Sequence, residues 1–257
     1  MSSMMFYQDL VPLNDKAHAD LRVSTISSYG FAARSNSVPV LAGEFAECAR
    51  EFPIVFGGQP GSVVPAALLG LRDGENLFVD PQGNWLARYT PAFIRRYPFA
   101  LGTGDTGQML VCIDQTARCL TTTAGEALFV EGAPSAALQR TMAFLREFQS
   151  AAVATAGLTQ RIEVLGLLRE ADSLAQLRDG SEFRLSGLRV IDESRLNALD
   201  DEAVLDLVKS GAMKLIYAHL ISLGNLAPLM DRLSTRLSAQ SVPVAKAPLK
   251  KRAAATT

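Results

Sequence analysis

An excess of charge of either sign is missing from this sequence of 257 residues. Its 25 lysines and arginines stand against 26 aspartates and glutamates, which leaves a formal net charge of -1 at pH 7. Proteins that bind nucleic acid usually carry a marked basic excess, so we expect no nucleic-acid partner.

Cysteine and histidine are also scarce. The three cysteines form no CxxC pair, and their odd number favours reduced thiols in a cytoplasmic protein over a disulfide framework. Two histidines in unlike surroundings do not indicate a metal site. The sequence also lacks the glycine-rich loops of phosphate and dinucleotide sites, and the GxSxG and HExxH motifs of hydrolases. We therefore expect neither a metal nor a cofactor.

Long hydrophobic runs are absent as well. No stretch of about 18 apolar residues occurs, and the most apolar helical candidate, 212–223, is shorter and carries Lys214 and His219. The first residues show no basic segment followed by an apolar one. We therefore expect no secretory signal, no transmembrane helix and no membrane insertion. The 48% of hydrophobic residues are nevertheless ample for a substantial core.

The stretch 51–103 organises the first half of the chain. It contains the only tryptophan and several apolar runs, which are separated by glycine and proline turn signals. Short apolar runs between such turns predict strands that join as an antiparallel meander. The predicted strands cover residues 54–56, 63–71 and 77–79, a turn then leads into 85–89, and a further core strand follows at 109–114.

Helical spacing of apolar residues dominates the second half. It predicts a long helix over 134–157 with a second or kinked part over 158–168, a hairpin over 174–188 that either joins the sheet or forms a small second one, and helices over 200–209, 212–224 and up to 237. The predicted fold class is α+β, with an antiparallel sheet core from the first half packed by helices mainly from the second half. We expect one domain over 1–237, with a possible subdivision near 133, and a disordered tail over 238–257.

The segment 88–99 is the least ordinary in composition, because arginines and aromatic residues alternate in it. Arg95, Arg96 and Tyr97 could bind an anion or a planar ligand through charge-assisted hydrogen bonds and cation–π contacts. Neighbouring arginines point to different faces of a helix, so at most one of them faces a given pocket. A polar or acidic residue between Asn76 and Asp80 would complete such a pocket.

Structural interpretations compete with this pocket. An arginine could pair with Asp80 or Glu75 while the aromatic residues fill the core. His219 would need a nucleophile or a carboxylate brought to it in space before it could act in catalysis. A core histidine that is hydrogen-bonded to its neighbours is the favoured interpretation, and His219 stays a candidate ligand-binding residue beside it.

Several motifs, in order along the chain, resemble those of the SapC family of bacterial proteins. They are EFPIVF (51–56), ALLGLRDGENLFVD (67–80), the W-x-x-x-Y-x-P-x-F-x-R-R-Y-P-F run (85–99), LVCID (110–114), GLRVIDESRLNAL (187–199) and LIYAHLISLGNL (215–226). Arg189 stands where an aromatic residue is expected in the family. The resemblance spans nearly the whole chain and implies a protein of about this length without an assigned reaction.

The family takes its name from a protein associated with a bacterial surface layer, and no catalytic residues can be carried over from it. Our first hypothesis is therefore a non-enzymatic accessory or binding protein, linked to cell-surface or envelope processes, with an unknown protein partner or small ligand. The alternative is a small-molecule-binding protein or enzyme that uses the pocket of arginine, tyrosine and acidic residues. A third hypothesis, regulation of gene expression, would require a basic surface.

Overall fold

The largest sheet has five strands and lies within the largest hydrophobic core. The computed structural model describes residues 5–104, 107–171, 173–176, 182–185 and 187–241. The strand order is β12-β15-β4-β5-β3, and every neighbouring pair is antiparallel. The strands are β3 (Ser37–Pro39), β4 (Ile54–Gly57), β5 (Val64–Leu68), β12 (Leu168–Glu170) and β15 (Arg189–Ile191). The predicted strands 54–56 and 63–71 are confirmed as β4 and β5, whereas β12 and β15 come from the second half.

The predicted meander does not continue beyond β5, and that part of the prediction is wrong. A single bridge between Val79 and Trp85 stands where further strands were expected. Side chains from distant segments satisfy the backbone there. Arg236 donates to the carbonyl of Val79 at 2.8 Å, and Glu51 accepts from the N–H of Tyr89 at 2.9 Å. A backbone that finds such partners does not need a neighbouring strand.

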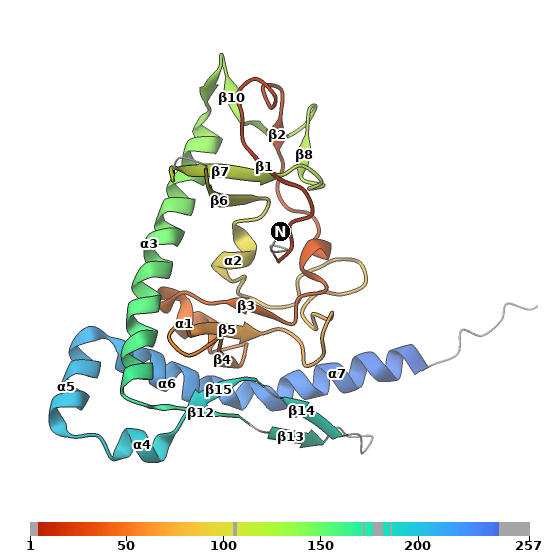
Figure 1. The fold of residues 1–257 in the computed structure, drawn as a ribbon. Helices are drawn as coiled ribbons and strands as arrows, with labels where there is room; N and C mark the ends of the chain where they lie inside the picture. The colour runs from red at the N-terminus through yellow and green to blue at the C-terminus, as the bar shows by residue number, and fades with distance from the viewer. Residues whose placement is uncertain (1–4, 105–106, 172, 177–181, 186, 242–257) are drawn as a thin grey trace, which may run out of the picture.

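A second antiparallel sheet, of order β1-β7-β6, is separate from the first (Figure 1). It contains β1 (Leu10–Pro12), β6 (Phe99–Thr103) and β7 (Met109–Asp114), and β7 is the strand predicted at 109–114. Smaller sheets pair β2 (Arg22–Val23) with β8 (Leu120–Thr121) and β9 (Glu126–Ala127), and β10 (Phe129–Val130) with β11 (Ala133–Pro134).

The predicted hairpin over 174–188 is confirmed in its two strands. They are β13 (Ser173–Gln176) and β14 (Glu182–Leu185), which pair with each other and form a two-stranded sheet of their own. The turn between them lies outside the described residues.

The helix α3 (Ala136–Val164) runs along one side of the molecule, from the small sheets near β10 to the sheet that holds β12 (Figure 1). Ser135 caps its start by accepting a hydrogen bond from the N–H of Leu138. The predicted end near residue 157 is wrong, since the helix continues through Gly157, a residue that a helix interior tolerates at modest cost. Leu145 packs in one hydrophobic cluster and Ile162 in another, so α3 joins the two cores.

The remaining helices come mostly from the second half, which confirms the α+β class. They are α1 (Phe45–Cys48), α2 (Ala92–Arg95), α4 (Glu193–Asn197), α5 (Asp201–Ser210), α6 (Ala212–Ser222) and α7 (Leu226–Ser241), with 3-10 turns η1 (Gly30–Ala32), η2 (Ala42–Glu44) and η3 (Leu223–Asn225). The helix α7 includes 238–241, which were predicted as tail, and residues 242–257 lie outside the described residues. No helix in the described part of the chain combines the length and the apolarity needed to cross a membrane.

Candidate functional site

Asn76 and Asp80, two of the predicted site residues, have local structural partners. The Asn76 side chain is fully buried, donates to the carbonyl of Ala32 at 3.0 Å and accepts from the N–H of Phe78 at 2.9 Å. Asp80 lies in an exposed turn and accepts from both the backbone and the side chain of Asn84 at 2.8 Å. These hydrogen bonds, led by that of the Asn84 side chain, lower the pKa of Asp80.

The two neighbouring arginines diverge, as helix geometry predicts. Arg95 is exposed and donates to the carbonyl of Thr90 at 3.0 Å. The Arg96 guanidinium lies 3.9 Å from the ring centroid of Phe93 and 5.0 Å from that of Phe148. Its Nε is buried without a hydrogen-bond partner, and burial lowers the pKa of this guanidinium.

The predicted ion pair of one of these arginines with Glu75 or Asp80 is wrong. Glu75 instead pairs with Arg72, three residues before it, at 2.6 Å. Among the described residues, no hydrogen bond or ion pair joins Arg95 or Arg96 to the segment from Asn76 to Asp80.

His219 connects α6 to the centre of the five-stranded sheet. Its Nε2 accepts from the N–H of Ile191 at 3.1 Å, and its Nδ1 lies 2.7 Å from the carbonyl oxygen of Ile54. Because Nε2 accepts, Nδ1 carries the proton and donates it to Ile54. The ladder between β4 and β15 pairs Phe56 with Arg189, so Ile54 and Ile191 would be the next partners in register. The histidine ring takes the place of a direct hydrogen bond from the N–H of Ile191 to the carbonyl of Ile54.

The Ser222 hydroxyl completes this attachment. It accepts from the N–H of Ile54 at 2.9 Å and donates to the carbonyl of His219 at 2.6 Å. All the polar atoms of the His219 ring therefore have backbone partners, which confirms the interpretation as a core histidine. Burial lowers the pKa of His219 to about 4.

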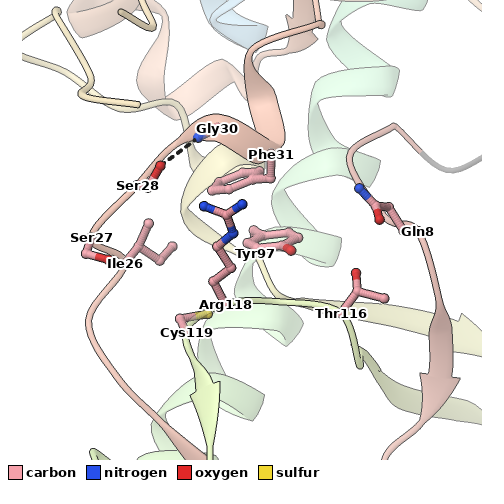
Figure 2. A pocket seen from close by; sticks show the side chains of 10 residues that line it. All are labelled: Gln8, Ile26, Ser27, Ser28, Gly30, Phe31, Tyr97, Thr116, Arg118 and Cys119. Carbon is pink, nitrogen blue, oxygen red and sulfur yellow. Dashed lines mark hydrogen bonds between the residues drawn. The ribbon is translucent and has the colours of Figure 1, made fainter. Parts of the chain in front are cut away.

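Tyr97, the remaining predicted residue, lies on the wall of a pocket of about 250 Å³ (Figure 2). Four segments of the chain meet there: the N-terminal arm at Gln8, the stretch from Ile26 to Phe31, Tyr97 shortly after α2, and the loop after β7. The rings of Phe31 and Tyr97 stack with centroids 3.8 Å apart and planes inclined by 11°. They give the pocket a flat aromatic wall.

Arg118 supplies the positive charge of this pocket. Its side chain rises from the loop after β7 toward Phe31, beside Tyr97 (Figure 2). It makes no hydrogen bond or ion pair with any residue that the structure describes, and it is exposed. An unpaired guanidinium keeps its planar set of donors available for a carboxylate or a phosphate.

Asp114, at the end of β7, fastens three walls of the pocket to one another. Its carboxylate is fully buried and accepts from the N–H of Gln8 at 3.1 Å, from the hydroxyl of Thr116 at 2.7 Å and from the hydroxyl of Tyr97 at 3.4 Å. Burial by itself would raise the pKa of Asp114, but the hydrogen bonds from Thr116, Gln8 and Asp9 outweigh it and hold the pKa below its usual range.

The pKa values of three titratable groups at the pocket are shifted away from neutral pH. Burial raises the pKa of Tyr97, and the charge of Asp114 raises it further. Burial also raises the pKa of the Cys119 thiol, so this cysteine is a poor nucleophile. Together with the lowered pKa of Asp114, these shifts leave no acid, base or thiolate among these three groups that would be poised near pH 7.

Sequence reasoning missed Arg118 and the wall from Ile26 to Phe31. The available signal was the position of Arg118 in a loop directly after a predicted core strand, where binding residues often lie. The stretch around Phe31 belongs to an arm without periodicity, and nothing in its pattern connects it with Tyr97.

The model of one protein family, SapC, matches residues 13–229. No curated protein and no solved structure matches the chain.

Proposed function

The chain belongs to the SapC family, and we propose that it is a non-enzymatic accessory protein that binds a small anionic molecule in the pocket of Arg118 and Tyr97. The observation that carries the proposal is the unpaired Arg118 guanidinium beside the stacked rings of Phe31 and Tyr97. A carboxylate or phosphate group would pair with the arginine, and a small planar or apolar part would lie against the rings.

The dimensions and chemistry of the pocket support a ligand of that class. Its volume of about 250 Å³ suits a small metabolite better than a large cofactor. Ser27 and Ser28 add hydroxyl groups to the lining, which can donate to the remaining oxygen atoms of an oxyanion. Asp114 holds the walls in place before the ligand arrives, which lowers the entropic cost of binding.

Binding is favoured over catalysis by the pKa shifts. Tyr97 and Cys119 hold their protons more tightly than usual, and Asp114 is ionised with its oxygen atoms committed to protein donors. A general acid or base needs a pKa near the working pH, and these groups move away from it.

The test is calorimetric titration of the full chain with inorganic phosphate and, separately, with benzoate. We expect one site for at least one of the two anions, and we expect Arg118→Gln to weaken its affinity by roughly tenfold or more, because a charge-assisted hydrogen bond is lost. Arg146→Gln, a change at an exposed arginine on α3, is the matched control and should bind like the parent. Failure of both anions to bind, or equal binding by Arg118→Gln, would overturn the proposal.

A cytoplasmic location and a role in cell-surface or envelope processes belong to the same proposal. Support for the location comes from the three free cysteines, Cys48, Cys112 and Cys119. Support for the envelope role comes from the family resemblance. Immunolabelling of fractionated cells would test the location and the envelope role. Recovery of the protein outside the cytoplasm would contradict the cytoplasmic location.

A further inference from the structure

A second surface, remote in sequence from the residues of the Arg118 pocket, exposes large apolar side chains on α5 and α6. Val208 is 56% exposed, Tyr217 is 55% exposed and Ile221 is 72% exposed. Single exposed apolar residues are ordinary, but these three line one common groove of about 720 Å³. An exposed apolar cluster of this kind indicates a surface that another molecule covers.

Small and large apolar residues together line the groove. Its walls come from the exposed side chains of α5 and α6, and alanines line it from two directions: Ala46 and Ala49 from α1 and the turn after it, and Ala218 from α6. Small residues let the backbone of a docked helix approach closely, while Tyr217 and Ile221 supply contact area on its flank.

The charged residues in the groove lining have one sign. Arg50 and Lys214 are the charged residues of its lining, and no carboxylate belongs to the lining. Lys214 forms no ion pair within the described part of the chain. Arg50 meets the exposed carboxylate of Glu47 at 3.5 Å, a surface pair of little strength that leaves the arginine available.

We propose that this groove docks an amphipathic helix of a different protein, with an apolar stripe toward Tyr217 and Ile221 and acidic residues toward Lys214 and Arg50. A second copy of the chain is disfavoured, because a two-fold contact centred on the groove would bring like charges together. A lipid surface is disfavoured, because the lining holds one arginine and one lysine, whereas anionic lipid surfaces attract larger clusters of basic residues.

The test uses a fluorescein-labelled helical peptide of about 18 residues, with leucines at helical spacing on one face and glutamates beside them. Anisotropy should report saturable binding to the full chain below about 100 µM, and a peptide with the same composition in scrambled order should not bind. Lys214→Glu should weaken binding by about tenfold and should favour a peptide in which lysines replace the glutamates. Ile221→Ser should weaken binding of both peptides.

Lys209→Glu is the control, since this exposed lysine on α5 lies outside the groove lining. The proposal is overturned if the acidic peptide does not bind, or if Lys214→Glu and Ile221→Ser bind it like the parent protein. It is also overturned if sedimentation shows self-association, or flotation shows binding to phosphatidylglycerol vesicles, that Ile221→Ser abolishes.

Discussion

Burial keeps His219 neutral, and the two hydrogen bonds of its ring fix which nitrogen carries the proton. The Nε2 atom accepts from Ile191, and a second proton on that atom would set one N–H against another. Burial lowers the pKa of His219 to about 4, while an unfolded chain gives a histidine pKa near 6.5. The pairing of two strands thus explains a residue that the sequence kept as a candidate for ligand binding.

A dependence of stability on pH follows. Between about pH 6.5 and pH 4 the unfolded chain binds a proton at His219 that the folded protein does not, so the free energy of unfolding falls as the pH is lowered through this range. The loss should reach about 2 kcal/mol at pH 5 and about 3 kcal/mol at pH 4. Urea unfolding at pH 7 and at pH 5 would measure it.

His219→Gln should be less stable at pH 7 and should lose less of its remaining stability between pH 6.5 and pH 5, because glutamine does not titrate. A His219→Gln protein with the same pH slope as the parent would contradict this account.

Asp114 is the second residue whose protonation state depends on the fold. Its buried carboxylate joins the N-terminal arm to β7 and to Tyr97. In Asp114→Asn an amide group replaces one acceptor and would face the N–H groups of Gln8 or Asp9. We expect a loss of about 2 kcal/mol in the free energy of unfolding, the size typical of hydrogen bonds to a charged group. Denaturant unfolding would measure it, and an unchanged midpoint would contradict the role assigned to Asp114.

At the scale of elements, the apolar pattern predicted the strands and helices whose formation depends on residues close by in the sequence. The strands β4 and β5 are apolar runs beside glycine turns, and α5 begins where Asp200 caps it. The segment 77–79, where a strand was expected, finds separate partners: the N–H of Phe78 donates to the Asn76 side chain, and the carbonyl of Val79 accepts from Arg236, 157 residues away. No local pattern carries that information.

Replacing either of two glycines by alanine should change the free energy of unfolding, but in opposite directions. Gly211 ends α5 with a φ of 87°, and an added Cβ would meet no atom within 4 Å, so Gly211→Ala should cost about 1 kcal/mol through backbone strain alone. Gly157 lies inside α3 with equally open surroundings, and Gly157→Ala should stabilise the protein by up to about 1 kcal/mol. Denaturant midpoints of both variants would measure this, and a neutral or stabilising Gly211→Ala would contradict it.

At the scale of the whole molecule, α3, which begins just after the subdivision predicted near residue 133, packs in two hydrophobic clusters. Leu145 packs with Phe99 and Ile113 of the smaller sheet, whereas Ile162 packs in the core of the larger one. The Arg118 pocket likewise gathers residues from four separated segments, so only Tyr97 of its lining was within reach of sequence reasoning. The fold class was predictable from composition and spacing, but the assembly of this pocket was not.

We propose that the described chain unfolds as one domain. Trp85 packs against the larger core and Cys119 belongs to a cluster beside the smaller sheet. The loss of Trp85 fluorescence and the exposure of the Cys119 thiol should therefore have the same midpoint in urea, because α3 packs against both sheets and couples them. Two separate midpoints would show that the chain divides into two folding units.

The most direct test of the central claim is an NMR titration of the unaltered protein with phosphate and with benzoate, followed through assigned backbone amides. The account predicts that saturating shifts concentrate at Ile26–Phe31 and at Thr116–Cys119, around the Arg118 guanidinium. Shifts confined to other parts of the protein, or no saturable shift with either anion, would contradict it.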